Sequence, residues 1–162
     1  MSMWTHVCGS FRVDCMVGLE PEPDFEDIFG RECLFDSPMT LWNELDENPS
    51  KFLPCGSEGT LQMSVWSNPD RHSMAAYTID IFGDLRDYND PAAIMEYFCT
   101  VCKRLARYSI RQAVMTANNE SGLMQTAVLD PIDANVVITT RCNGAVHTKV
   151  VNCMESDNNE ND

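Results

Sequence analysis

The feature that most constrains the fold of this chain is one strong helical segment set among segments of alternating polarity. Residues 90–108 open with Asp90-Pro91, a capping residue followed by the residue best suited to a first helical turn. The apolar side chains then recur at helical spacing as Ile94, Phe98, Val101, Cys102 and Leu105. Together with the alternating segments, this helix predicts an α+β protein.

The alternating segments predict strands. Residues 4–17 place Val7, Phe11, Val13, Cys15 and Val17 on one face and polar side chains on the other. Asn143-Gly144 between two alternating runs is a strong signal for a tight hairpin. Six further strands are expected at residues 61–66, 77–81, 110–117, 123–129, 135–140 and 145–151.

Two short helices are expected between the first and second strands. Phe25, Ile28 and Phe29 have helical spacing, and Gly30 ends that run. Ser37-Pro38 starts a second run, which Asn48-Pro49 stops.

The order of the first six elements matches a split β-α-β, or ferredoxin-like, arrangement, in which helices cover one face of an antiparallel sheet. We therefore predict a ferredoxin-like antiparallel sheet with two helical layers on one face and a C-terminal β-hairpin extension. Residues 1–154 form a single α+β domain in this prediction, and residues 155–162 form an acidic disordered tail.

Negative charge is concentrated in two parts of the chain. Residues 20–47 hold ten carboxylates against the single base Arg31, and the tail holds four more, within a formal net charge of −14. Carboxylates gathered in this way repel one another but attract cationic partners. Solvated surface is the plainer interpretation, yet ten acids to one base exceed what solubility requires. The predicted partner-binding residues are Glu22, Asp24, Glu26, Asp27, Glu32, Asp36, Glu44, Asp46 and Glu47.

The same charge argues against other partners. An acidic surface repels nucleic-acid phosphates and anionic lipid, so neither direct nucleic-acid binding nor membrane binding is expected. Imitation of DNA is a narrower hypothesis, because it requires carboxylates spaced like phosphates, at one charge per ~1.7 Å of duplex axis.

A basic stripe supports an alternative interpretation. The residues Lys103, Arg104, Arg107 and Arg111 follow or end the main helix, where cations complement the negative end of the helix dipole. The functional alternative is an anion-binding site for a small ligand or substrate, or an internal partner for the acidic segment.

No catalytic motif is found, and we expect neither enzyme activity, nor a metal, nor a cofactor. Cys99 and Cys102 have redox spacing but lie inside the predicted helix rather than at its N-terminus, which favours core packing. A zinc site would need two more ligands at suitable spacing. The N-terminal residues lack the features of a secretory signal, so the eight cysteines are interpreted as reduced thiols of a cytoplasmic protein.

Four segments carry a resemblance: MWTHVCGSFRVD, LPCGSEGTLQMSVWSNPD, AAYTIDIFGDLRDY and SIRQAVMT. They resemble segments of small proteins that recur in bacteriophage and prophage genomes of gut bacteria. The resemblance implies that the protein is phage-encoded, that it acts in the host cytoplasm, and that it binds and inhibits host proteins such as nucleic-acid-handling or defence complexes. It implies no functional residues. Together with the charge, it favours a non-catalytic acidic interaction protein that binds a basic surface of a host protein.

Overall fold

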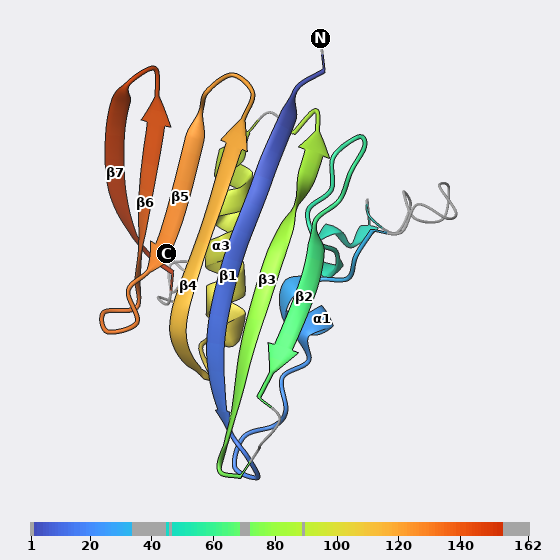
Figure 1. Ribbon diagram of the computed structural model, residues 1–162, viewed down its shortest axis with the longest axis vertical. Helices are drawn as coiled ribbons and strands as arrows, with labels where there is room; N and C mark the ends of the chain where they lie inside the picture. The colour runs from blue at the N-terminus through green and yellow to red at the C-terminus, as the bar shows by residue number, and fades with distance from the viewer. Residues whose placement is uncertain (1, 34–44, 46, 69–71, 89, 154–162) are drawn as a thin grey trace, which may run out of the picture.

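The computed structural model describes residues 2–33, 45, 47–68, 72–88 and 90–153, and within them it shows an α+β protein built on one antiparallel sheet (Figure 1). The chain runs β1 (Trp4–Met16), α1 (Phe25–Phe29), η1 (Pro49–Lys51), β2 (Gln62–Ser67), β3 (Met74–Arg86), α3 (Pro91–Leu105), β4 (Ser109–Asn119), β5 (Met124–Leu129), β6 (Asn135–Cys142) and β7 (Ala145–Asn152). The predicted α+β class is confirmed.

The described strands form a single seven-stranded sheet with the order β2-β3-β1-β4-β5-β6-β7. All neighbouring strands are antiparallel, and the long strands β1 and β3 pair along their whole length. A bulge between Arg12 and Val13 shifts the register of β1 against β4. Residues 4–119 therefore supply the β2-β3-β1-β4 half, and the remaining strands extend the β4 edge.

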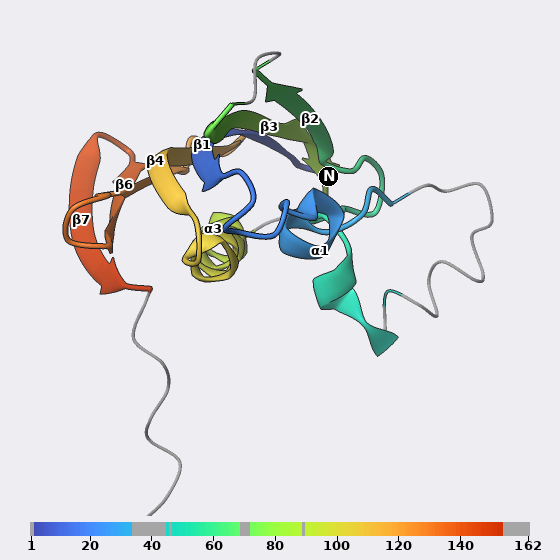
Figure 2. The same cartoon turned by 90° about the horizontal axis from the view of Figure 1, so that it is seen from below.

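Both named α-helices lie on the same face of the sheet, and no helix of the described residues covers the opposite, open face (Figure 2). Asp90 caps α3 as predicted, since its Oδ1 accepts a hydrogen bond from the Ala92 amide at 2.9 Å. Gly30 ends α1 with a φ of 103°, a conformation that favours glycine.

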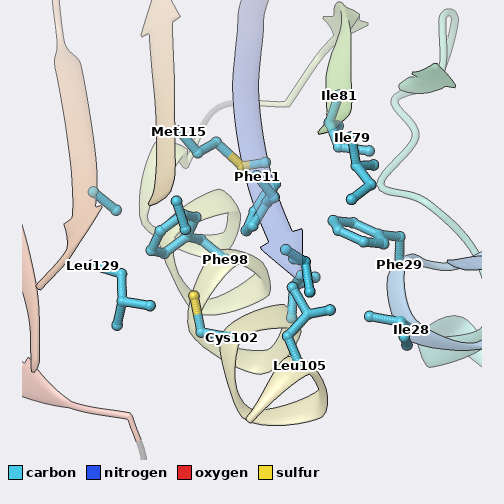
Figure 3. Packing of buried hydrophobic residues seen from close by; sticks show 14 of the residues in the cluster. Phe11, Ile28, Phe29, Ile79, Ile81, Phe98, Cys102, Leu105, Met115 and Leu129 are labelled. Carbon is cyan, nitrogen blue, oxygen red and sulfur yellow. The ribbon is translucent and has the colours of Figure 1, made fainter. Parts of the chain in front are cut away.

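The core lies between the sheet and the two helices (Figure 3). Phe11 of β1 is fully buried and contacts two rings, with centroid distances of 5.0 Å to Phe29 of α1 and 5.3 Å to Phe98 of α3. Cys102 is also buried in this core, as its place inside the helix predicted. One aromatic cluster therefore joins both helices to the central strand.

Several predicted boundaries differ from the structure. β3 starts at Met74 and ends at Arg86, well beyond the predicted 77–81, because backbone pairing with β1 continues past the apolar stretch. Val17 was predicted to lie on the core face, but β1 ends one residue earlier and Val17 is 45% exposed. The main helix ends at Leu105 rather than near Tyr108.

The C-terminal hairpin is confirmed. Asn143 and Gly144 both have positive φ, 49° and 81°, as a tight turn of this type requires. Apart from Val151, which is half-buried, β7 is exposed on both faces. The second short helix predicted from Ser37-Pro38, and the tail predicted for residues 155–162, lie outside the described residues apart from Leu45 and residues 47–49.

A groove between the acidic helix and the basic end of the main helix

An open groove of about 790 Å³ lies where α1, η1 and the end of α3 come together. The acidic side chains come from residues 22–27 at the start of α1, and the basic side chains come from Arg31 just after α1, from η1, and from the end of α3 and the residues after it. The lining residues are Pro21, Glu22, Asp24, Glu26, Asp27, Ile28, Arg31, Ser50, Lys51, Arg104, Arg107 and Tyr108. The structure thus brings part of the predicted acidic site and part of the predicted basic stripe to one place.

The acidic wall is built by the start of α1. Asp24 caps the helix, because its side chain accepts a hydrogen bond from the Asp27 amide at 3.1 Å. Glu22 is fixed from the sheet side by the hydroxyl of Tyr77, which lies 3.1 Å from Glu22 Oε1. Glu26 and Asp27 are exposed, and their carboxylates form no ion pair with any residue that the structure describes. Among the four carboxylates that line the groove, these two are therefore the most open to a partner.

The basic wall is held partly by the backbone of α1 itself. Arg104 donates from Nη1 to the carbonyl oxygen of Ile28 at 3.0 Å. Arg107 lies over the ring of Tyr108, 5.6 Å from its centroid, and the Tyr108 hydroxyl donates to the carbonyl oxygen of Pro21 at 3.2 Å. Lys51 is exposed at the end of η1. This wall combines cations with one aromatic surface.

The predicted basic stripe does not stay together. Lys103 is exposed and does not line the groove. Arg111 lies on β4, where its Nε is 2.7 Å from Oδ2 of Asp14 on the neighbouring strand β1. Arg111 therefore neutralises a mostly buried carboxylate, a partner that the linear sequence does not indicate.

The other predicted acidic residues also separate. Glu32 leaves the α1 cluster, since its Oε1 accepts a hydrogen bond from the Met63 amide of β2 at 3.2 Å. Glu47 is exposed and lies outside the groove lining. The remaining three, Asp36, Glu44 and Asp46, lie outside the described residues.

Charge among the residues that line the groove is balanced. The lining carries four carboxylates and four cations. Residues 20–47 hold ten carboxylates in the sequence, but Glu20, Glu32 and Glu47 lie outside the lining, and Asp36, Glu44 and Asp46 lie outside the described residues. The negative excess predicted from the sequence is therefore not a property of the groove lining itself.

The described residues hold no group of three or more histidine, cysteine or carboxylate side chains arranged to bind a metal ion. The spacing of His6 and Asp84 in the sequence does not indicate the contact between His6 Nδ1 and Asp84 Oδ1, which are 2.6 Å apart on the open face of the sheet. The register of β1 against β3 pairs these two residues. Among the described helices, none has the length and apolar character needed to cross a membrane.

The cysteines fall into different environments. Burial and a hydrogen bond to Cys153 raise the pKa of the Cys99 thiol to about 12, and burial also raises the pKa of Cys102. Cys33 and Cys55, which lie far apart in the sequence, are joined by a side-chain hydrogen bond. Nothing in their spacing indicated this contact.

Comparisons with known proteins add no family to this description. A scan against protein-family models gave no match. Searches of curated proteins and of solved structures likewise gave no significant match.

Proposed function

We propose that this protein is a non-catalytic interaction protein that binds a basic surface of a host protein through the exposed carboxylates of α1 and the neighbouring acidic segment. The observation that carries the proposal is the state of Glu26 and Asp27, which are exposed at the edge of the groove and have no cationic partner among the described residues. Unpaired carboxylates on one side of a groove attract a cationic side chain from a partner.

The net charge of the whole chain supports the choice of a basic partner. The formal net charge is −14, so a basic surface gains long-range attraction while an acidic one meets repulsion. The cations of the opposite wall can pair with an acidic side chain at the edge of the same partner. Such mixed pairing fixes the orientation of a complex more than it adds affinity.

The proposal extends to the identity of the host partner and to the fold. A nucleic-acid-handling or defence complex fits, because its nucleic-acid site is a basic surface that a DNA-like array of carboxylates could occupy and inhibit.

The ferredoxin-like assignment is also a proposal, supported by the order β2-β3-β1-β4 with α1 and α3 on one face.

A second candidate function rests on the opposite wall of the groove. Lys51, Arg104 and Arg107 lie around the Tyr108 side of the groove, which suits a small anionic ligand with a flat group. In this candidate function, the anion site predicted from the sequence keeps only Arg104 and Arg107, and Lys51 is added to it.

The two candidates are separated by a binding experiment with matched variants. The wild-type protein, the double variant E26K/D27K and the control E96K/D133K are each used for pulldown from a gut-bacterial lysate at low and high salt. Glu96 and Asp133 are exposed and lie outside the groove lining, so the control changes net charge equally. We expect a salt-sensitive host protein that wild type and control retain and E26K/D27K loses. Equal retention by all three variants would contradict the proposal.

A further inference from the structure

The thiols of Cys33 and Cys55 are brought together by backbone pairing between the segments that carry them. The Arg31 amide donates to the carbonyl oxygen of Lys51, and the Leu53 amide donates to the carbonyl oxygen of Arg31, each at 2.8 Å. This pairing places Cys33 beside residues 53–55, where its thiol contacts the Leu53 carbonyl oxygen at 3.6 Å and hydrogen-bonds with the Cys55 side chain.

The loop that carries Cys55 is held firmly. Cys55 forms an antiparallel bridge with Thr60, and the Gly56 amide donates to the carbonyl oxygen of Gly59 at 3.0 Å. The Ser57 amide donates to the carbonyl oxygen of Arg86 on β3 at 2.9 Å. Cys55 is therefore positioned against Cys33 by a fixed backbone rather than by a chance side-chain contact.

The two thiols differ in their access to solvent. Cys33 is 1% exposed, whereas Cys55 is half-buried and lines a cavity of about 330 Å³. Tyr88 and Tyr97 line the same cavity. A small oxidant or electrophile can thus reach Cys55 but not Cys33.

The two thiols also differ in pKa, and this difference again favours Cys55 as the reactive group. The hydrogen bond between the two side chains lowers the pKa of Cys55, although burial opposes this effect. The same bond, together with burial, raises the pKa of Cys33. The accessible sulfur is therefore the one that ionises first.

We propose that Cys55 is a reactive thiolate and Cys33 its resolving thiol, so that a hydroperoxide converts the pair into a Cys33–Cys55 disulfide. This site is independent of the proposed binding function, because its chemistry needs neither the groove nor a partner. It also differs from the Cys99–Cys153 contact, in which burial favours the neutral thiol of Cys99.

The chemistry takes two balanced steps. The Cys55 thiolate attacks one oxygen of hydrogen peroxide, forms an S–O bond as the O–O bond breaks, and gives a sulfenic acid and hydroxide. The Cys33 sulfur then attacks the Cys55 sulfur, displaces the hydroxyl group as water and gives up its proton. Two thiols are oxidised by two electrons, and the peroxide is reduced. In the product the two sulfurs are joined at the ~2.05 Å of a disulfide bond.

Alkylation by iodoacetamide at neutral pH, followed by peptide mass spectrometry, tests the first half of the proposal. Cys8 is the control, because it is exposed on the open face of the sheet with no thiol as cross-strand neighbour. We expect Cys55 to be alkylated faster than Cys8 although Cys8 is the more exposed. Slower or equal alkylation of Cys55 would overturn the proposal.

Two substitutions of Cys33 separate the hydrogen bond from the disulfide. Cys33→Ser retains a donor and should leave Cys55 alkylation fast, while Cys33→Ala should slow it about threefold for each pKa unit gained, since the thiolate fraction falls tenfold and nucleophilicity partly recovers. With hydrogen peroxide, wild type should give the Cys33–Cys55 disulfide, and both variants should carry Cys55 on to sulfinic acid. Circular dichroism confirms that each variant is folded. A wild-type protein that yields no such disulfide, or equal alkylation in both folded variants, contradicts the proposal.

Discussion

Arg104 of α3 donates a hydrogen bond from Nη1 to the carbonyl oxygen of Ile28 in α1, over 3.0 Å. A helix of five residues leaves most of its carbonyl groups without a partner inside the helix, so this cation supplies one of the missing donors. Tyr97 adds a second link, since its hydroxyl donates to the carbonyl oxygen of Phe29 at 2.8 Å. The two helices that form the groove are therefore joined by side chains of α3.

Replacement of Arg104 should loosen this junction. Arg104→Met keeps much of the aliphatic side chain but removes the donor, and we expect a loss of about 1.5 kcal/mol in the free energy of unfolding. Lys103→Met is the matched control, because Lys103 is the exposed neighbouring cation and should cost much less. Urea denaturation measures both, and equal losses would show that the hydrogen bond to α1 contributes nothing.

Gly30 should tolerate no side chain. Its φ is 103°, and an added Cβ would lie 2.5 Å from the backbone carbon of Phe52, which belongs to the paired segment beside Cys33. We expect Gly30→Ala to cost more than about 3 kcal/mol, since backbone strain and a backbone clash add together. Gly18→Ala, at a φ of 81° with nothing within 4 Å, should cost only about 1–2 kcal/mol, the strain of that conformation. Thermal denaturation of the two variants distinguishes clash from strain.

Alkaline pH should destabilise the fold through its buried thiols. The pKa of Cys99 is raised to about 12 from an ordinary value of 9.0, and that of Cys102 is raised too, so in the folded state these thiols keep protons that the unfolded chain loses. The unfolded state binds fewer protons from pH 9 upward, so stability is complete below about pH 9 and falls as the pH rises toward 12.

The double variant Cys99→Ala/Cys102→Ala tests this pH effect. Its unfolding free energy should fall less steeply above pH 9 than that of wild type, whatever its stability at neutral pH. Cys8→Ala, at an exposed thiol, should keep the wild-type slope. The idea fails if all three proteins lose stability in parallel across this range.

Arg111 should act in stability and not in anion binding. Its Nε neutralises Asp14, whose side chain is only 14% exposed, so Arg111→Ala should cost about 1 kcal/mol, a value that allows for the 58% exposure of the arginine. Inorganic phosphate titrated by calorimetry provides the second measurement. If the groove cations bind anions, Arg107→Ala should weaken phosphate binding and Arg111→Ala should leave it unchanged. If only Arg111→Ala weakens phosphate binding, the result would favour the basic stripe predicted from the sequence over the groove cations.

Local sequence patterns predicted a helix or strand correctly where the tertiary surroundings favour the same structure. The alternation in β1 and the cap at Asp90 each specify an element through contacts within a few residues. The ends of β3 escaped prediction because Gly83 interrupts the apolar alternation before Leu85 resumes it, and pairing with β1 sustains the strand through this gap. Strand length was decided by the neighbouring strand.

The site was predicted only in part. The carboxylates of α1 and the cations at the end of α3 were both identified, but their meeting in one groove depends on α1 packing against α3 on the same face of the sheet. Arg111 and Glu32 were grouped with their sequence neighbours, whereas the structure assigns them to Asp14 and Met63. Long side chains pair with whatever lies within reach, and sequence proximity does not define that neighbourhood.

The sequence by itself determined the secondary elements, the α+β class and the excess of negative charge, because each depends on local conformational preference or on composition. Only the tertiary structure decided the strand order, the balance of charge in the groove and the contact between Cys33 and Cys55. These features join residues far apart in the chain, and burial of the shared core fixes which of them meet.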